Sequence, residues 1–274
     1  MFYNIKEYPD KTSYAQILCS VPTLVFRVNT YADLWHLNQV VDAYNHQDVT
    51  PTIIIPNLID AQADRRFNDN ESSGLKLVCN FLNGMKANFK IFHPHNAEVV
   101  EALIDNVEII DNYDFIYKAL TNISIANEYN CDENLVLISS DAGGFKPLMK
   151  LCDQLKWGGQ VHSCSKGRSY DGNKSELTQR VGKEDFFGKD VLIVDDICVY
   201  GGTFKGLAKL LRQRNVGKLY LATSHITIQN HAKDSVFDYF DHVYTTNSKF
   251  DTYWATGSKG EPVTPNNLTI IKQF

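Results

Sequence analysis

The most constraining feature of the chain is the run VLIVDDICVYGGTFKGLAKLLRQR, from Val191 to Arg214. Its first four residues, 191–194, are apolar and lead directly into Asp195 and Asp196. A short, wholly apolar run is typical of a strand that is buried on both faces of a parallel sheet. Open α/β sheets bind their ligands at the carboxyl ends of such strands. The run therefore predicts a ligand site at the acid pair.

The Gly-Gly-Thr turn that follows the acid pair is suited to an anion. Gly201 and Gly202 allow backbone N–H groups to turn toward a ligand, and a helical pattern begins directly after them. Because the start of a helix carries positive partial charge, a loop of this kind can hold a phosphate, and Thr203 completes it. The two carboxylates cannot bind that phosphate, but they suit sugar hydroxyls or a metal ion. The run predicts a site for a phosphorylated sugar.

Composition excludes several other classes. The net charge of −5 provides no broad basic surface, so we expect no nucleic-acid partner. No apolar run approaches the roughly 18 residues that a membrane-spanning helix needs, and the first residues do not resemble a signal peptide. The six cysteines form no CxxC pair, which favours free thiols in a reducing compartment. We expect a cytoplasmic protein without a membrane partner.

Strand-like runs alternate with amphipathic stretches, which predicts an α/β fold with parallel sheets and helices on both faces. The clearest predicted strands are 23–28, 52–59, 89–94, 134–140, 191–196, 219–228 and 268–274. The predicted helices are 32–44, 74–85, 97–104, 145–155 and 204–214. A polar segment at 128–133 predicts two domains, 1–127 and 128–274, and the last strand could return to the first. The irregular stretch 158–188 predicts a mobile lid.

The run after Val194 resembles the phosphoribosyl-binding signature DD-I-x-D-T-G-G-T of type I phosphoribosyltransferases and ribose-phosphate pyrophosphokinases. The residues that match are Asp195, Asp196, Gly201, Gly202 and Thr203. Val199 and Tyr200 depart from it, since the family usually has Asp and Thr there. The resemblance implies two phosphoribosyltransferase-like domains, each a mainly parallel sheet flanked by helices.

Four further segments are similar to motifs of the ribose-phosphate pyrophosphokinases, in the family's order. IPNLIDAQADRR at 55–66 resembles the PYxPYARQDR motif, and HPHN at 93–96 resembles D-P-H-S. SDAGG at 140–144 resembles S-P-D-A-G-G, and KGR at 166–168 resembles the lid motif K-x-R. Each fragment alone is a weak signal, but five in the right order extend the resemblance over most of the chain.

The resemblance assigns Mg²⁺ on the ATP phosphates to His95 and Asp141. A carboxylate oxygen suits Mg²⁺, whereas a histidine is unusual for so hard an ion and could act through water. His93 stands where the family has Asp, which removes one negative charge. Taken alone, His95 would be an ordinary hydrogen-bonded residue, and the segment after Asp141 would be a tight strand-to-helix turn.

ATP binding is assigned, again by resemblance, to Asp10, Gln62, Asp64, Arg65 and His95. Asp10 lies in a segment, 8–12, that is similar to the family's F-x-D-G-E, which reaches the adenine across a subunit interface. An ordinary turn is the alternative there. Gln62 and Ala63 stand where relatives carry Arg and Gln. The resemblance also implies a homo-oligomer.

The resemblance makes Lys166 and Arg168 the main catalytic cations, which would close over the triphosphate. Transfer of a phosphoryl-type group depends on positioning and on cations around the developing charge. Arginine can contact two oxygens at once, whereas lysine acts as a point charge. The alternative is that both residues are solvated surface charges.

The implied reaction is Mg²⁺-dependent transfer of the β,γ-diphosphate of ATP to the anomeric 1-hydroxyl of a 5-phosphorylated ribose, with release of AMP. The sugar-phosphate residues would be Asp141, Asp195, Asp196, Tyr200, Gly201, Gly202 and Thr203. Two other classes remain open. A phosphoribosyltransferase would use the same loop but consume the activated sugar, and a regulatory relative would bind a partner without catalysis.

Tyr200 bears on the acceptor. A large flat side chain does not suit a tight pocket for a phosphate dianion, but it could stack on the distal base of a capped phosphate. We therefore slightly favour ADP-ribose as the acceptor, as in phage-associated relatives that are thought to make ADP-ribose pyrophosphate in an NAD-rebuilding route. Ribose 5-phosphate, which would give PRPP, is the alternative acceptor. A tyrosine that only packs within the loop is the alternative for the residue.

Overall fold

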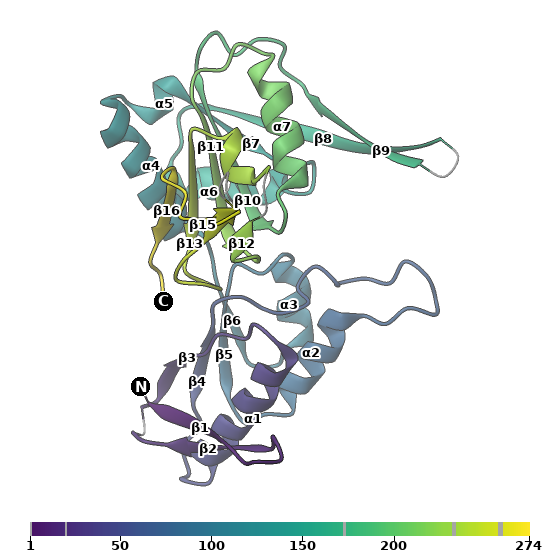
Figure 1. Cartoon of the computed structure of the whole chain (residues 1–274), viewed down its shortest axis with the longest axis vertical. Coiled ribbons are helices and arrows are strands. Elements are labelled where there is room, and N and C mark those ends of the chain that lie inside the picture. The colour runs from purple at the N-terminus through teal and green to yellow at the C-terminus, as the bar shows by residue number, and fades with distance from the viewer. Residues whose placement is uncertain (1, 20, 172–173, 232–233, 257–259) are drawn as a thin grey trace. The chain divides into compact units, whose positions relative to one another are not determined.

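The computed structural model describes residues 2–19, 21–171, 174–231, 234–256 and 260–274 (Figure 1). Within strands, the side chains of 166, 168–171, 174–178 and 231 lie outside this description. The chain divides into two compact units, Met1–Asp111 together with Phe274, and Asn112–Gln273. Within the described segments, none of the helices has the length and apolar character that crossing a membrane requires.

The first unit is built on a parallel sheet in the order β3-β4-β5-β6. Its strands are β3 Thr23–Val25, β4 Thr52–Ile55, β5 Asn88–Phe92 and β6 Val107–Ile110. The helices of this unit are α1 Tyr31–Asn45, α2 Gly74–Asn83 and α3 Ala97–Leu103. The strands β1 Tyr3–Glu7 and β2 Ser13–Ile17 form a separate antiparallel hairpin.

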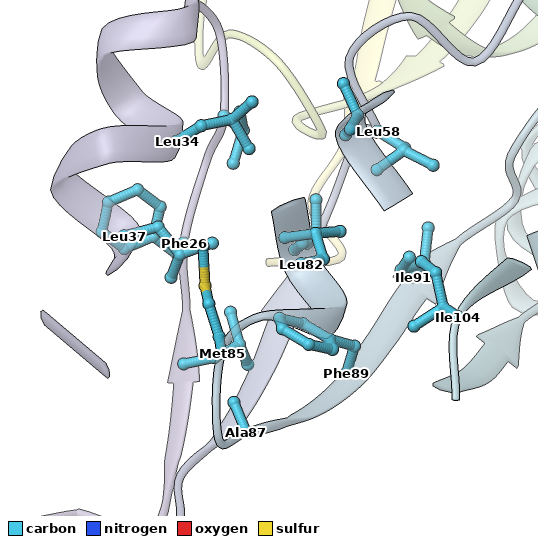
Figure 2. Packing of buried hydrophobic residues seen from close by; sticks show 14 of the residues in the cluster. Phe26, Leu34, Leu37, Leu58, Leu82, Met85, Ala87, Phe89, Ile91 and Ile104 are labelled. Atoms are coloured by element: carbon cyan, nitrogen blue, oxygen red, sulfur yellow. The ribbon is translucent and has the colours of Figure 1, made fainter. Parts of the chain in front are cut away.

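Apolar side chains of the sheet and of its helices form one core in the first unit (Figure 2). Phe89 and Ile91 of β5 meet Leu37 of α1 and Leu82 of α2 in this cluster. Each such side chain stabilises the fold by roughly 1.5–3 kcal/mol when it is removed from water. The core thereby fixes the carboxyl ends of β4 and β5, where two of the predicted ATP motifs begin.

The second unit contains a seven-stranded sheet in the order β16-β13-β11-β10-β7-β8-β9. Its strands are β7 Leu135–Ser139, β8 Gln160–Asp171, β9 Lys174–Val181, β10 Asp190–Cys198, β11 Leu219–Ile226, β13 His242–Thr246 and β16 Leu268–Ile271. Neighbouring strands run parallel except for β9, which is antiparallel to β8. A small sheet comprises β12 Asn230–His231, β14 Trp254–Thr256 and β15 Pro262–Val263.

Helical segments complete the second unit. They are α4 Tyr113–Asn127, α5 Cys131–Asn134, α6 Phe145–Leu155, α7 Gly202–Arg212 and the 3-10 turn η1 Val236–Tyr239. Successive residues of β10 enter opposite cores: Ile193 packs in the cluster that contains Leu207 of α7, and Leu192 packs in the cluster that contains Leu148 of α6. The predicted α/β fold, with mainly parallel sheets flanked by helices, is confirmed.

The division between the units lies before α4, whereas the sequence predicts it after residue 127. The physical reason is burial, because Phe115, Ile116 and Ile123 of α4 pack in a core of the second unit. The last strand also remains in the second unit, where β16 pairs with β13. Phe274 alone groups with the first unit, and its ring centroid lies 5.2 Å from that of Phe92.

The segment 158–188 is not irregular. Most of it forms a long antiparallel hairpin, β8–β9, whose register runs from Cys164 opposite Val181 to Asp171 opposite Lys174. Backbone hydrogen bonds define such a ribbon, so it does not need the alternation of apolar residues that marks a half-buried strand. The expectation of an irregular stretch was therefore wrong.

Candidate functional site

The acid pair, Asp195 and Asp196, lies near the carboxyl end of β10. Both carboxylate oxygens of Asp195 accept hydrogen bonds. The hydroxyl of Ser140 donates to Oδ2 of Asp195 at 2.5 Å. The backbone N–H of Asp196 donates to Oδ1 of Asp195 at 2.9 Å. Ser140 is buried and directly follows β7, the parallel neighbour of β10. The strand pairing thus fixes the orientation of the Asp195 carboxyl group.

Burial raises the pKa of Asp195 to about 8, and the negative charge of Asp196 acts in the same direction. The hydrogen bond from Ser140 opposes this rise, because it stabilises the ionised form. A cation or a sugar hydroxyl that reaches this carboxyl group would favour its ionised form in the same way. The site is therefore electrostatically suited to a ligand that brings positive charge or hydrogen-bond donors.

The glycine loop after β10 has a geometry that requires glycine at one position. Gly201 has a φ of +75°, and a Cβ there would lie 2.5 Å from the Cβ of Val236. Gly202 begins α7, which runs for 11 residues, so the first N–H groups of a full helix border the loop. Tyr200 is 74% exposed. The structure therefore does not support a tyrosine that only packs within the loop.

A neighbouring segment supports this loop from behind. Val236 opens the turn η1 and lies against Gly201. The ammonium group of Lys205, in the first turn of α7, donates to the backbone carbonyl of Asp234 at 3.0 Å and contacts its carboxylate at 3.2 Å. These contacts hold the glycine loop and α7 in place independently of any ligand.

Asp141 lies in the turn between β7 and α6. Its Oδ1 accepts a hydrogen bond from the N–H of Gly144 at 3.1 Å, and its backbone carbonyl accepts one from the hydroxyl of Ser139 at 2.8 Å. The carboxylate is thus folded toward the start of α6. Ser140 joins this turn to Asp195 through its hydroxyl, so the structure brings the predicted Asp141 loop and the acid pair together in one unit.

The donor chemistry at this sheet edge fits Mg²⁺. Asp141, Asp195 and Asp196 offer carboxylate oxygens, and Mg²⁺ is usually bound through one or two carboxylates together with substrate phosphates. Across the described residues, His, Cys, Asp and Glu side chains form no group of three that could hold a metal ion. Carboxylates of this kind suit an ion that is shared with substrate phosphates.

Two predicted ATP motifs meet within the first unit. Asp64, in the loop after β4, accepts a hydrogen bond from the side-chain amide of Asn96 at 3.3 Å. Asn96 follows His95 and also caps α3 by accepting from the N–H of Val99 at 3.2 Å. His95 is exposed. The loops after β4 and β5 are therefore tied together next to His95.

The remaining ATP candidates lie at exposed positions. Gln62 is exposed, and the guanidinium of Arg65 lies 5.7 Å from the centroid of the Phe67 ring. Asp10 lies in the turn of the β1–β2 hairpin, where Thr12 donates to it from its N–H at 3.1 Å and from its hydroxyl at 2.7 Å. These bonds lower the pKa of Asp10. Nucleotide binding by these residues stays a prediction.

Lys166 and Arg168 lie in β8, opposite Gln179 and Leu177 of β9. Their side chains lie outside the described part of the structure, so only their backbone positions are established. Both residues belong to a regular ribbon in the second unit, rather than to an irregular loop. Their assignment as the catalytic cations remains a prediction.

The sequence alone did not reveal the contacts that hold the predicted site residues. Asp195 is contacted by Ser140, and Asp64 is contacted by Asn96. Val236 lies against the Gly201 position. A hydroxyl residue directly after an apolar run was a usable signal for Ser140, but only the strand order places it beside β10. No local pattern pairs residue 236 with residue 201.

Comparisons with known proteins identify the family and the relatives of this chain. Residues 108–258 match the family described as "Phosphoribosyl transferase domain". The sequence is 28% identical over 218 residues to a ribose-phosphate pyrophosphokinase of Chlorobaculum tepidum, a match that covers 79% of this chain and 64% of that protein. It is 24% identical over 233 residues to ribose-phosphate pyrophosphokinase 2 of Archaeoglobus fulgidus, covering 85% of this chain and 79% of that one.

The fold is similar to that of a solved relative. The crystal structure of phosphoribosylpyrophosphate synthetase from Mycobacterium smegmatis matches with a TM-score of 0.72 over 98% of this chain and 85% of that chain. The identity is 18%, so this likeness establishes the fold alone. Together with the sequence relatives, it confirms the resemblance to ribose-phosphate pyrophosphokinases that the five motifs predict.

Proposed function

This chain belongs to the phosphoribosyl transferase domain family, and on that premise we propose that it is a pyrophosphokinase of the ribose-phosphate type. It transfers the diphosphate of ATP to the anomeric hydroxyl of a 5-phosphorylated ribose and releases AMP. The observation that carries this proposal is the arrangement at the carboxyl edge of the second sheet, where Ser140 and Asp195 adjoin the loop of Gly201. The named relatives, which act on ribose phosphate, support the same class of reaction.

Each residue of this edge has a proposed task. The N–H groups at the start of α7 bind the 5-phosphate, because Gly201 permits the necessary turn. Asp196 and Asp195 accept hydrogen bonds from the ribose hydroxyls, and Ser140 keeps Asp195 oriented. Lys166 and Arg168 bind the triphosphate and stabilise the charge that develops during transfer.

Bound Mg²⁺ would neutralise charge on the transferring phosphates. Asp141 offers an oxygen donor for this ion in the second unit, and His95 is its proposed companion by resemblance. Asp10, Gln62, Asp64 and Arg65 are the proposed ATP contacts. By the same resemblance, we propose a homo-oligomeric enzyme of nucleotide metabolism. Its free cysteines favour a reducing compartment such as the cytoplasm.

A second acceptor, ADP-ribose, is favoured by one observation. Tyr200 stands at the start of the phosphate loop and exposes 74% of its surface. An exposed aromatic ring beside a phosphate site can stack on a base. Because the phosphate of ADP-ribose is capped by AMP, its adenine could reach such a ring, and the product would serve a route that rebuilds NAD. The relatives' names support ribose 5-phosphate instead.

The function is tested by incubating the protein with ATP and Mg²⁺, adding each acceptor in turn, and following the release of AMP. We expect acceptor-dependent AMP from the wild type. Lys166→Ala is expected to lower the rate by about 10²-fold or more, because a transition-state cation is lost. Lys150→Ala, an exposed lysine of α6, is the matched control and should keep the wild-type rate.

The outcomes separate the competing functions. If ribose 5-phosphate turns over as well as ADP-ribose or better, the capped acceptor is overturned while the reaction class stands. Consumption of PRPP with a nucleobase, and no AMP release from ATP, would instead identify a phosphoribosyltransferase. An Lys166→Ala variant with the full wild-type rate would remove this residue from catalysis.

A further inference from the structure

Gln179 of β9 connects two parts of the second unit that the mechanism needs together. Its side-chain amide donates a hydrogen bond to the backbone carbonyl of Thr203, at 2.9 Å, in the first turn of α7. The carboxamide oxygen of Gln179 lies against Gly206, about one helical turn further along α7. A Cβ at Gly206 would overlap this oxygen. The β9 strand packs against α7 (Figure 1). The carboxamide thus lies against the first turns of α7.

The same residue also faces the strand that carries the proposed catalytic cations. Lys166 occupies the register position directly opposite Gln179 in the β8–β9 ribbon. Because the two residues are register partners, a contact that holds Gln179 against α7 also restrains the β8 backbone at position 166.

We propose that Gln179 is a positioning residue that holds the Lys166 strand in place against the phosphate-binding loop. The loop itself has separate supports, because Val236 lies against Gly201 and Lys205 is bound to Asp234. The loss of Gln179 would therefore leave sugar-phosphate binding largely intact. It would increase the mobility of the β8–β9 ribbon and of the Lys166 backbone. We therefore expect a lower kcat and little change in KM for the sugar.

This inference rests on the proposed function for its kinetic consequence, but its structural part can be measured separately. Gln179→Met keeps the length of the side chain and removes both hydrogen-bonding groups. Gln213→Met is the matched control, since Gln213 is exposed at the other end of α7. Gly206→Ala is an independent probe, because its new methyl group would displace the Gln179 amide from Thr203.

For Gln179→Met, we expect kcat to fall about 10- to 100-fold, since misplacing a catalytic group by about 1 Å has this effect. KM for ribose 5-phosphate should change by less than about threefold, as for a transition-state interaction. Gly206→Ala should lower kcat similarly without lowering thermal stability, because alanine is the better helix former. In the double variant the two losses should not add, since both act through one hydrogen bond. Gln213→Met should match the wild type.

Hydrogen exchange of the β8 backbone provides the readout that does not depend on activity. Gln179→Met and Gly206→Ala should both accelerate exchange in β8, and Gln213→Met should not. Accelerated exchange in a protein that releases no AMP would refute the proposed function while supporting the contact role of Gln179. Unchanged exchange and kcat in both variants, with Lys166→Ala impaired, would overturn the positioning role. Fully additive losses in the double variant would overturn it as well.

Discussion

Gly201 combines two constraints that each select glycine, a left-handed φ of +75° and the close approach of Val236. Gly201→Ala therefore introduces backbone strain and a steric overlap at once. We expect the free energy of unfolding to fall by about 2–6 kcal/mol, the sum of typical costs for the two effects. Urea denaturation of the variant and the wild type measures this difference.

Gly202→Ala is the control for that experiment, because a Cβ at Gly202 meets no atom within 4 Å. Its free energy of unfolding should change by less than about 1 kcal/mol. If the two alanine variants were equally stable, the tight contact between the loop and Val236 would be refuted.

Asp195 gives a prediction about pH. Its pKa is raised from 3.8 to about 8 in the folded protein, so the folded state binds this proton more tightly than the unfolded chain does. The contribution of this proton to the free energy of unfolding is therefore at its full value below about pH 4. It decreases as the pH rises and has disappeared above about pH 8. Asp195→Asn cannot ionise, so it should be more stable than the wild type at pH 8, yet lose activity.

Denaturation at pH 4.5 and pH 8, in the presence of a metal chelator, measures this difference. The stability gain of Asp195→Asn over the wild type should be clearly larger at pH 8. If Asp195→Asn were less stable than the wild type by the same amount at pH 4.5 and at pH 8, the raised pKa of a buried Asp195 would be contradicted.

At the scale of single residues, a local motif is enough to predict candidate ligand-binding groups. Asp195, Asp196 and Gly201 stand within seven positions of one another, and their types alone indicate a sugar-phosphate site. Ser140 could not be assigned to Asp195 in the same way, because the contact depends on the pairing of β7 with β10. Contacts between distant segments depend on the order in which the strands pair, and a single sequence does not reveal that order.

At the scale of elements, α4 decides where the two units divide. Its apolar face packs in the second unit, so Ile116→Ala should lower the free energy of unfolding by about 2–5 kcal/mol, as expected when a large core side chain is truncated. Ile125→Ala is the matched control on the same helix, since Ile125 is 72% exposed. Its effect should stay below about 1 kcal/mol. Equal losses in the two variants would contradict the packing of α4.

The same scale shows why some elements were predictable and others were not. The strands β10 and β11 are buried on both faces and appear in the sequence as apolar runs. The β8–β9 ribbon contains lysine, serine, glycine and arginine without regular alternation, and therefore resembled a loop. The regular structure of this ribbon comes from backbone pairing between β8 and β9, which its side-chain pattern does not reveal.

At the scale of the whole molecule, the chain contains two units, each with a parallel sheet core, and residues 108–258 place it in the phosphoribosyl transferase domain family. The likeness to phosphoribosylpyrophosphate synthetase extends over 98% of the chain at only 18% identity. In the predicted site, the acid pair and the glycines match the family signature, whereas positions 199 and 200 differ from it.

The proposed reaction breaks the bond between the α- and β-phosphates of ATP. The most direct test is phosphorus NMR of a reaction that contains the protein, ATP, Mg²⁺ and ribose 5-phosphate or ADP-ribose. We predict AMP and a 1-diphosphorylated sugar in equal amounts. The appearance of ADP with a monophosphorylated product, or unchanged ATP with both acceptors, would contradict the proposed reaction.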